Sequence, residues 1–334
     1  MDHTPSAEEI AAFIDAKTKP IGALGRIETL AANLARQQRT LMPRLETLTL
    51  VVFAADHGIA AEGVSAYPQA VTVEMVRTLL AGGAAANVFA EAVGADVQVV
   101  DAGIARPFDH PDLVVRRQGT GTANAAQGPA MSAEIAAAAR AAGEAIGAGL
   151  ETDAAAFGEM GIANTSAAAL LAHKLTGLPL DRLVGRGTGL DDAGLATKRR
   201  ILEAAAARTG PLSAEAAAAE YGGFEIVMMA GAMIGAAKAG RPVLVDGFIA
   251  TTAVLFALAL TPEIRPALLF CHRSAEPGHS AILEHLGAEP LLDFGLRLGE
   301  GTGALLAWPL VRAAARMLSD MASFDSAGVS RAER

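Results

Sequence analysis

Apolar residues occur along this chain of 334 residues in short uninterrupted runs, which alternate with longer segments of helical periodicity. The clearest run, residues 47–55, is almost wholly apolar or β-branched and does not alternate between polar and apolar positions. Because strands inside a parallel sheet are buried on both faces, such continuity predicts a parallel strand. Similar runs predict further strands at 96–100, 153–157, 242–245, 267–271 and 289–292.

Segments of helical pattern separate most of these runs. They lie at roughly 70–93, 132–149, 164–175, 191–207, 224–239, 249–259, 279–286 and 303–319. Six short strands alternating with helices predict an α/β fold with a doubly wound, mainly parallel, six-stranded sheet of Rossmann-like type. Each predicted strand ends in an acidic or glycine-rich turn. Since ligands of open parallel sheets bind outside the carboxyl ends of the strands, these turns are expected to converge on one site.

The two ends of the chain lie outside this alternation. A helix is predicted to open at Ser6, because Ser6 and Glu9 have the spacing of a capping box. A second helix precedes the first strand, and the last helix follows the final strand. We therefore predict a small helical subdomain formed by residues 1–40 and 305–334, and a large catalytic α/β domain over 41–304.

The loop before the last helix holds an acidic residue, Glu300, between Gly299 and Gly301. Glycines let the backbone approach a ligand closely, and a helix beginning near Gly301 would point its free N–H groups at an anion. A carboxylate at such a place is electrostatically unfavourable unless the chemistry requires a base there. Glu300 is therefore either a candidate general base or a solvated glutamate in a glycine-rich turn, and this stretch alone leaves both open.

The composition excludes several classes of protein. A formal net charge of -9 disfavours a nucleic-acid partner, since phosphate binding needs a basic face. The single Cys271 excludes an intramolecular disulfide and fits a reducing cytosol. The N-terminus lacks the order of a signal peptide, and the most apolar stretch, residues 247–260, is shorter than the ~20 residues that span a bilayer. We expect a cytoplasmic protein with no membrane partner.

Three further stretches contain more glycine and polar residues than turns need. They are residues 54–69, 158–166 and 185–192, and the last leads into a helix that carries Lys198. Together with the Glu300 loop they supply glycines for close approach to a phosphate, a cation and at least two carboxylates. This combination predicts a site for a phosphorylated sugar and an acid–base step.

Other nucleotide-binding motifs fit the sequence less well. The glycine-rich stretches 185–189 and 299–303 lack the third glycine of the dinucleotide fingerprint, which disfavours a dehydrogenase. No Gly-Lys-Ser/Thr follows a glycine loop, which excludes a P-loop NTPase. The pair Asp56-His57 is interpreted as a cap on its strand end in preference to a metal-ligating or catalytic pair.

Metal and hydrolase sites are also weak alternatives. Cys271, His272, Glu276 and His279 could form a zinc site, but a structural zinc usually takes two thiolates or a paired ligand spacing. Ser274 with His279 could mimic a hydrolase triad, but Ser274 lacks the Gly-x-Ser-x-Gly elbow.

The ordered set of motifs resembles the nicotinate-nucleotide–dimethylbenzimidazole phosphoribosyltransferases of cobalamin nucleotide-loop assembly. The resemblance extends from about residue 15 to 320, and each motif gains its specificity from the combination. The motifs lie at 20–25, 56–58, 63–69, 158–161, 164–165, 185–189, 198, 246–248, 272–274, 276–279 and 296–303.

The resemblance implies a reaction and an assembly. The phosphoribosyl group of nicotinate mononucleotide passes to 5,6-dimethylbenzimidazole, giving α-ribazole 5′-phosphate and nicotinate with inversion at the anomeric carbon. The family fold is a parallel α/β domain with a small helical domain from both termini, and its members are homodimers. No cofactor or metal is expected, because the leaving group already carries a pyridinium charge.

The resemblance also assigns residues. Glu300 falls at the general base, which takes the proton of the benzimidazole N–H, and Glu159 falls at a second carboxylate of the nucleotide site. Nucleotide and phosphate binding is expected of Gly161, Asn164, Thr165, Lys198, Asp246, Ser274, Gly301 and Gly303, and base binding of Ser65, Tyr67 and Gln69. A carboxylate that removes one ring proton makes the other ring nitrogen a better nucleophile. Glu159 would stabilise the positive charge of the oxocarbenium-like sugar.

Two alternatives to this function remain. The first is a related transferase or hydrolase that acts on another nucleoside phosphate. The second is a nucleotide-binding regulatory protein that has kept the fold, although a sensor needs no general base. Candidate bases that differ by one methyl group are not distinguished by the sequence, since such a group is worth only about 1–3 kcal/mol in an apolar pocket.

Overall fold

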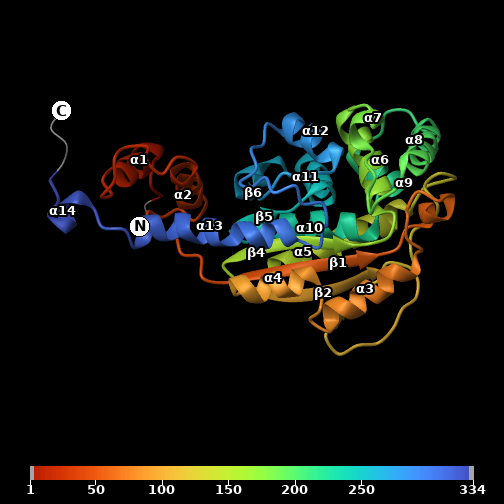
Figure 1. Ribbon diagram of the computed structural model, residues 1–334, viewed down its shortest axis with the longest axis horizontal. Helices are drawn as coiled ribbons and strands as arrows, with labels where there is room; N and C mark the ends of the chain where they lie inside the picture. The colour runs from red at the N-terminus through yellow and green to blue at the C-terminus, as the bar shows by residue number, and fades with distance from the viewer. Residues whose placement is uncertain (1–3, 331–334) are drawn as a thin grey trace.

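The computed structural model describes residues 4–330, and its centre is a six-stranded parallel sheet with helices on both faces (Figure 1). The strands are β1 (Leu48–Ala55), β2 (Asp96–Gly103), β3 (Leu113–Val115), β4 (Ala154–Met160), β5 (Val243–Val245) and β6 (Leu268–Phe270). Their order is β3-β2-β1-β4-β5-β6, and all neighbours pair in parallel. The predicted α/β class and doubly wound sheet are confirmed, with the strand order of Rossmann folds.

One of the six predicted strands is wrong. Residues 289–292 run beside the end of β6, but only Leu292 forms a bridge, with His272. Pro290 lies within this run and has no N–H to donate to a strand ladder. The sixth strand is instead β3, an edge strand of three residues whose pattern is too short to predict.

Helices cover both faces because each face of the sheet is apolar. One core contains Val51 and Phe53 of β1, and the helices α5 (Ala133–Ala148), α10 (Phe224–Lys238) and α11 (Phe248–Leu260) pack into it. The opposite core contains Leu50 and Val52, and it is covered by α3 (Ala70–Leu80), α4 (Ala85–Val93) and α13 (Thr302–Ser319). Alternate side chains of one strand thus enter two cores, as the continuous apolar run predicts.

The predicted helix 70–93 is two helices, α3 and α4. Gly82 takes a positive φ of 78° and Gly83 follows it, so the chain turns after Leu80. The break gives α4 a free N-terminus close to Glu300, since the Ala86 N–H lies 3.4 Å from Glu300 Oε2.

The remaining helices form two groups. At the carboxyl side of the sheet lie α6 (Asn164–Thr176), α7 (Leu180–Leu183), α8 (Asp192–Ala206), α9 (Ala214–Tyr221) and α12 (Pro277–Leu286), with the 3-10 helix η1 (Gly58–Glu62). The 3-10 helix η2 (Pro262–Ala267) leads into the start of β6. At the other end lie α1 (Ala7–Asp15), α2 (Arg26–Gln37) and α14 (Phe324–Ala327) (Figure 1).

Helix α13 connects this terminal group to the sheet. Its first half contains Ala304 and Leu305 in the core beneath the sheet, and its second half packs against α2. The Lys17 ammonium donates to the carbonyls of Leu318 and Met321, at 2.7 and 2.8 Å, which joins the chain ends. Trp308, the only tryptophan of the sequence, is fully buried in the middle of α13.

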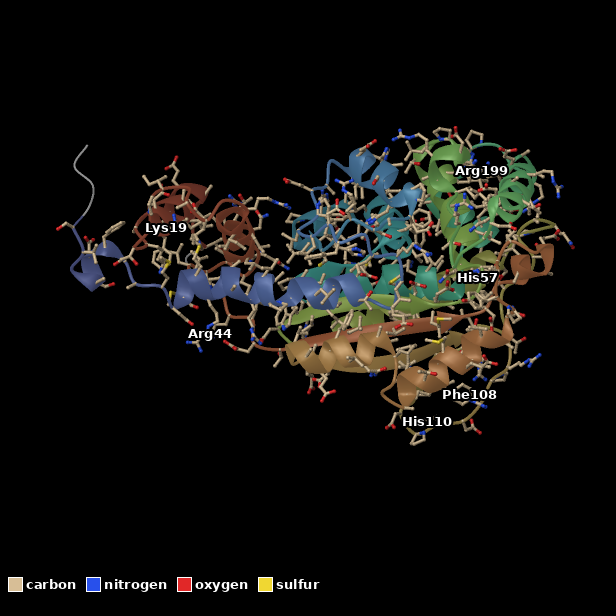
Figure 2. The ribbon with its side chains drawn as sticks, in the orientation of Figure 1. Lys19, Arg44, His57, Phe108, His110 and Arg199 are labelled. Atoms are coloured by element: carbon tan, nitrogen blue, oxygen red, sulfur yellow. The ribbon has the colours of Figure 1, made fainter. Side chains whose placement is uncertain are left out.

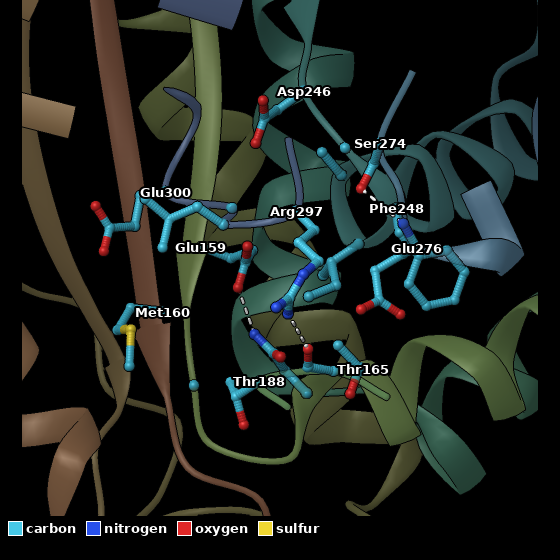
Figure 3. Close-up of a pocket in the computed structure, with 18 of the residues that line it drawn as sticks. Glu159, Met160, Thr165, Thr188, Asp246, Phe248, Ser274, Glu276, Arg297 and Glu300 are labelled. Atoms are coloured by element: carbon cyan, nitrogen blue, oxygen red, sulfur yellow. Dashed lines mark hydrogen bonds between the residues drawn. The ribbon is translucent and has the colours of Figure 1, made fainter. Parts of the chain in front are cut away.

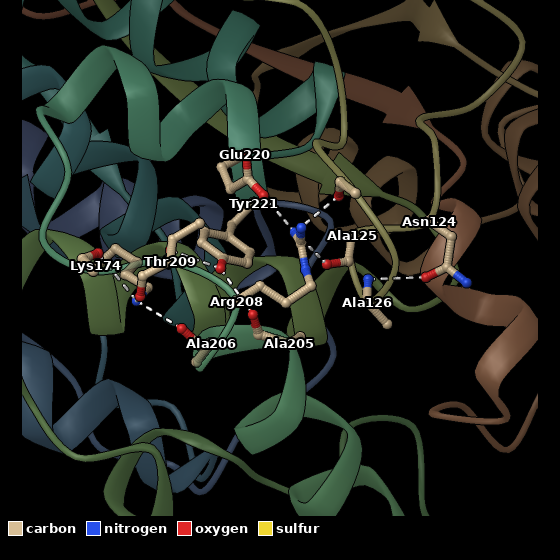
Figure 4. A network of polar contacts seen from close by, with 12 residues as sticks. Asn124, Ala125, Ala126, Lys174, Ala205, Ala206, Arg208, Thr209, Glu220 and Tyr221 are labelled. Atoms are coloured by element: carbon tan, nitrogen blue, oxygen red, sulfur yellow. Dashed lines mark hydrogen bonds and ion pairs between the residues drawn. The ribbon is translucent and has the colours of Figure 1, made fainter.

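Polar contacts fix the connections around α8 and α9 (Figure 4). The buried Tyr221 hydroxyl donates to the carbonyl of Ala205 at 2.8 Å, and Lys174 donates to the carbonyl of Ala206 at 2.8 Å. Arg208 pairs with Glu220 and also donates to two carbonyls of the loop before α5. These bonds fix the C-terminal end of α8, the helix that carries Lys198.

Candidate active site

A cavity of about 350 Å³ lies beyond the carboxyl ends of β4, β5 and β6. Strands β1 and β4 are neighbours at the point where the strand order reverses, which is where Rossmann folds bind their ligands. Among the predicted residues, those in the cavity wall are Tyr67, Glu159, Gly161, Asn164, Thr165, Asp246, Ser274 and Glu300. The acidic and glycine-rich turns of β4, β5 and β6 therefore do converge on one site.

Five other predicted residues do not line this cavity, and they have different surroundings. Ser65 accepts the Tyr67 N–H, and the Gln69 amide donates to the carbonyl of His57. Gly301 and Gly303 donate their N–H groups to the buried carboxylate of Asp246. The fifth, Lys198, is buried directly behind the wall.

Glu300 sits in a tight turn in which three consecutive residues take positive φ. The values are 91° at Gly299, 59° at Glu300 and 81° at Gly301. Burial raises the pKa of the Glu300 carboxyl above its ordinary value, and the nearby charge of Asp246 acts in the same direction. The Ala86 N–H at the start of α4 offsets part of this rise. Glu300 is thus a buried carboxyl with an elevated pKa, as a general base near neutral pH requires.

Glu159, the penultimate residue of β4, is also buried at the cavity wall. Its carboxylate accepts a hydrogen bond from the side-chain amide of Asn164, the first residue of α6. Burial raises its pKa well above the ordinary value, and the charges of Asp246, Glu225 and Glu300 raise it further. The cavity therefore has a surplus of negative charge that a cationic ligand would relieve.

The Asp246 carboxylate accepts hydrogen bonds from the backbone at the start of α13. Its Oδ1 accepts the N–H groups of Gly303 and Ala304 at 2.8 and 3.3 Å, and its Oδ2 accepts the Gly301 N–H at 3.2 Å. The free N–H groups of α13, expected to bind a ligand anion, are therefore occupied by a carboxylate of the protein itself. Asp246 also lines the cavity, and nucleotide or phosphate binding by Asp246, Gly301 and Gly303 stays a prediction.

Cations gather at one end of the cavity. The Lys198 ammonium is almost wholly buried and donates to Thr165 Oγ1 at 2.8 Å. Burial lowers its pKa to about 8, against the opposing charge of Glu276. Arg297 lines the same end and donates to the carbonyl of Gly187 at 3.0 Å. Arg199, the next residue of α8, points outward instead (Figure 2).

The opposite end is apolar. Figure 3 shows Glu300 and Met160 on one side, Ser274, Glu276 and Phe248 on the other, and Glu159 and Arg297 between them. Tyr67, Val71, Met75 and Leu298 complete the apolar part of the wall. The site therefore combines a pocket for an apolar ring beside Glu300 with a cationic pocket for an anion.

Arg297 was not singled out as a site residue from the sequence, and Glu276 was named only in the zinc alternative. Both lie within quoted motifs, and the signal that could have found Arg297 is its place three residues before Glu300. The Glu276 carboxylate faces Gly185, where any Cβ would overlap it. This constraint on Gly185 can be recognised only in the folded structure, because no local sequence pattern indicates it.

The buried pair of His57 and Glu225 also needs the fold, because 168 positions separate its members. His57 Nε2 lies 2.7 Å from Glu225 Oε1. Burial alone would lower the pKa of His57, but the Glu225 carboxylate outweighs it and raises the pKa. The neighbouring Asp56, which follows β1, accepts the Ala105 N–H at 2.8 Å and so links the ends of β1 and β2.

The zinc and hydrolase alternatives do not fit the geometry. His279 Nδ1 accepts the Ser274 backbone N–H at 2.8 Å, and its Nε2 bonds the Thr251 hydroxyl. Its pKa is lowered to about 3, with burial as the main cause, so the ring stays neutral. Cys271 donates to the carbonyl of Leu269. Within residues 4–330, no three His, Cys, Asp or Glu side chains are arranged to hold a metal ion.

The fold and the two-ended cavity define an enzyme of the phosphoribosyltransferase class, and a family model described as "Phosphoribosyltransferase" matches residues 2–329. The nicotinate-nucleotide–dimethylbenzimidazole phosphoribosyltransferase of Aromatoleum aromaticum is 55% identical over 321 residues, which is 95% of this chain and 93% of the relative. The enzyme of the same name from Cupriavidus necator is 54% identical over 97% of this chain and 95% of its own length. The chain belongs to this family of nicotinate-nucleotide–dimethylbenzimidazole phosphoribosyltransferases.

Solved structures agree with this assignment. The crystal structure of CobT from Thermus thermophilus superposes with a TM-score of 0.95 at 48% sequence identity, over 98% of this chain and 100% of that one. A crystal structure of the nicotinate-nucleotide–dimethylbenzimidazole phosphoribosyltransferase from the same organism gives 0.93 at 46% identity, over 98% of each chain. The fold assignment thus rests on close relatives along nearly the whole chain.

Proposed function

We propose that this protein transfers the phosphoribosyl group of nicotinate mononucleotide to 5,6-dimethylbenzimidazole, giving α-ribazole 5′-phosphate and nicotinate for cobalamin biosynthesis. Family membership gives the reaction. The observation that carries the assignment of chemistry to residues is the buried Glu300, which has a raised pKa and lies beside the apolar part of a cavity that also has a cationic end.

Glu300 is the proposed general base. The benzimidazole ring fits the apolar end formed by Val71, Met75, Met160 and Leu298. There Glu300 would accept the proton from one ring nitrogen while the other attacks the anomeric carbon. The C–N bond to nicotinate breaks, and its electron pair neutralises the pyridinium nitrogen. General-base assistance of this kind contributes about 10²–10⁴-fold to rate.

Glu159 is the proposed electrostatic stabiliser. It lies between the two ends of the cavity (Figure 3), where the sugar ring would develop positive charge. An isolated buried carboxylate is unfavourable, as the raised pKa of Glu159 reflects. A pyridinium or oxocarbenium cation beside it favours its anionic form. Its stabilisation is therefore largest when substrate is bound.

The 5′-phosphate is assigned to the cationic end. Lys198 and Arg297 supply charge there, and Thr165 lies in the first turn of α6, whose N-terminus favours anions. The loop of Gly161 precedes this helix and lines the cavity. Ser274 lies across from them in the wall.

The direct test is an assay of the purified protein with nicotinate mononucleotide and dimethylbenzimidazole. Release of nicotinate together with α-ribazole phosphate is the expected result. Release of nicotinate without the base would indicate a hydrolase, and binding without turnover would indicate a regulatory protein. Competition between dimethylbenzimidazole, benzimidazole and adenine then identifies the preferred acceptor.

We further propose that the protein acts as a homodimer in the cytoplasm. Two large apolar side chains, Ile21 and Phe294, are about 70% exposed, at 72% and 71%. The proposal rests on the family resemblance, and these two side chains are positions at which it can be tested. Light scattering is expected to give twice the 34.0 kDa mass of the chain. For Ile21→Asp the measured mass is expected to fall to that of a single chain. A monomeric native protein would contradict the dimer.

Within the described part of the chain, no helix is long and apolar enough to cross a membrane.

A further inference from the structure

Contacts from β4 and from the residues that follow β5 and β6 hold the turn that carries Glu300. A glutamate with positive φ costs about 1–3 kcal/mol, and such a conformation persists only where its surroundings enforce it. One enforcing contact comes from β4, because a Cβ at Gly158 would lie 2.6 Å from the Glu300 carbonyl oxygen. Glycine at 158 thus lets the turn lie directly on the strand.

The second contact comes from Asp246, at the carboxyl end of β5. This side chain is 3% exposed, and its two oxygens accept the N–H groups of Gly301, Gly303 and Ala304. Three hydrogen bonds from backbone amides to one carboxylate fix the start of α13 immediately after Glu300. Hydrogen bonds to a charged acceptor are about twice as strong as neutral ones, so this is a firm anchor.

The third contact comes from His272, which follows β6. Its Nε2 lies 3.2 Å from Asp246 Oδ1. Because the carboxylate can only accept, the contact is attractive when Nε2 carries the proton. The ring also packs against α13, since a Cβ at Gly303 would overlap it. His272 thus orients the carboxylate and fills the space under the first turn of the helix.

We propose that Asp246 and His272 form a positioning pair, which holds the general base Glu300 in its reactive orientation through the first turn of α13. The inference rests on the proposed function of Glu300. Neither member of the pair takes part in the proton transfer. The pair acts through the backbone of residues 301–304, and the three strands β4, β5 and β6 together fix the base.

The matched variants are His272→Phe and His272→Gln. Phenylalanine keeps a ring of similar size but has no donor, whereas the glutamine amide nitrogen reaches close to the position of Nε2. We expect His272→Phe to lower kcat by about 10-fold or more while the Kd of nicotinate mononucleotide stays within about threefold. His272→Gln is expected to restore most of kcat.

A double-mutant cycle with Glu300→Gln distinguishes positioning from a general structural effect. If His272 acts through Glu300, then adding His272→Phe to Glu300→Gln changes kcat by less than about twofold. Multiplying effects of the two changes would overturn the inference. So would a His272→Phe enzyme with wild-type kcat, or one that loses affinity for the mononucleotide at unchanged kcat, because His272 would then be a ligand.

Asp246→Asn gives an independent readout, and it replaces His272→Phe in the cycle if that variant does not fold. The charged groups that face Glu300 are Asp246 and Glu159, and the Asp246 charge raises the pKa of Glu300. We therefore expect the acid limb of kcat to move to lower pH in Asp246→Asn, with a reduced maximum. An unmoved limb and an unchanged maximum would contradict the pair. By contrast, a Glu300→Gln enzyme within a few-fold of wild type would refute the general-base role of Glu300, on which the pair depends, whereas absence of transfer in the native protein would refute the proposed function.

Discussion

At the scale of residues, two carboxyls in one cavity have different surroundings. Glu300 accepts a hydrogen bond from a backbone amide at a helix start, whereas Glu159 accepts one from a side-chain amide. Burial raises the pKa of both, but only Glu159 is raised by three neighbouring carboxylates. This difference supports separate roles, in which Glu300 exchanges a proton and Glu159 stabilises a positive charge on the substrate.

Replacing Glu300 by glutamine removes the base and keeps the shape of the side chain. We expect turnover to fall by roughly 10²–10⁴-fold, the usual size of a general-base contribution. Binding of nicotinate mononucleotide should change little, because the cationic end of the cavity is untouched. Steady-state kinetics and calorimetric titration measure the two effects separately. Turnover within a few-fold of wild type would remove Glu300 from this role.

The pH dependence follows from the direction of the Glu300 pKa. A base must be deprotonated, so kcat is expected to fall as the pH falls through the pKa of Glu300. That pKa is raised above the ordinary 4.5 of a glutamate, so the acid limb lies at higher pH than for an exposed glutamate. The residual activity of Glu300→Gln should lack this limb. A limb that survives in the variant would assign it to another group.

Replacing Lys198 by alanine removes the buried cation beside Thr165. We expect mainly a weaker Kd for nicotinate mononucleotide, with a smaller change in kcat, because the charge serves the phosphate in ground and transition states alike. Arg199→Ala is the matched control, since Arg199 is the next residue of the same helix and points outward. An unchanged binding isotherm for Lys198→Ala would refute the phosphate assignment.

The sequence predicted the residues of the cavity better than their contacts. Glycines around Glu300 indicated a tight turn followed by the start of a helix, and the structure has both. The partner of that helix start was unreadable, because Asp246 lies 55 to 58 positions away from the amides it accepts. Polar pairs formed across strands leave no local pattern, whereas turns do.

At the scale of elements, β4 and the Glu300 turn touch backbone to backbone. We expect Gly158→Ala to lower both kcat and the melting temperature, because the added methyl group would press on the Glu300 carbonyl and the Gly301 nitrogen, each 2.6 Å away. Gly128→Ala is the control, since nothing lies within 4 Å of a Cβ there. Wild-type kcat in Gly158→Ala would show that the turn tolerates displacement.

Long apolar or periodic segments predicted the elements well, and short ones did not. Strand β1 is apolar throughout and was recognised, because a strand buried on both faces leaves a continuous pattern. Strand β3 has three residues and pairs only with β2, so its pattern carries too little information. The run 289–292 looks similar in composition, yet Pro290 keeps it out of the ladder.

At the scale of the whole molecule, we propose that residues 1–40 and 305–334 act as a small helical subdomain beside a catalytic domain over 41–304. Residues 1–3 and 331–334 of this division lie outside the described residues. The packing of α1, α2 and the second half of α13 supports it, although one apolar core continues from these helices to the sheet.

Hydrogen exchange tests this division. Leu34→Ala creates a cavity in the fully buried contact of α2, at a cost of about 2–5 kcal/mol. If the terminal helices form a unit, exchange should accelerate in α1, α2 and the end of α13, while α5 and α10 stay protected. Uniform acceleration in all helices would indicate one cooperative domain.

The position of Trp308 has a consequence for experiment. It is the only tryptophan of the chain, it is fully buried, and it lies six residues into the helix that starts beside Glu300, about 9 Å along its axis. Its ultraviolet emission therefore comes from one known place in the molecule, without a label or a background from other indoles. A change in that emission on adding substrate would report, in solution and in real time, movement of the helix that holds the base.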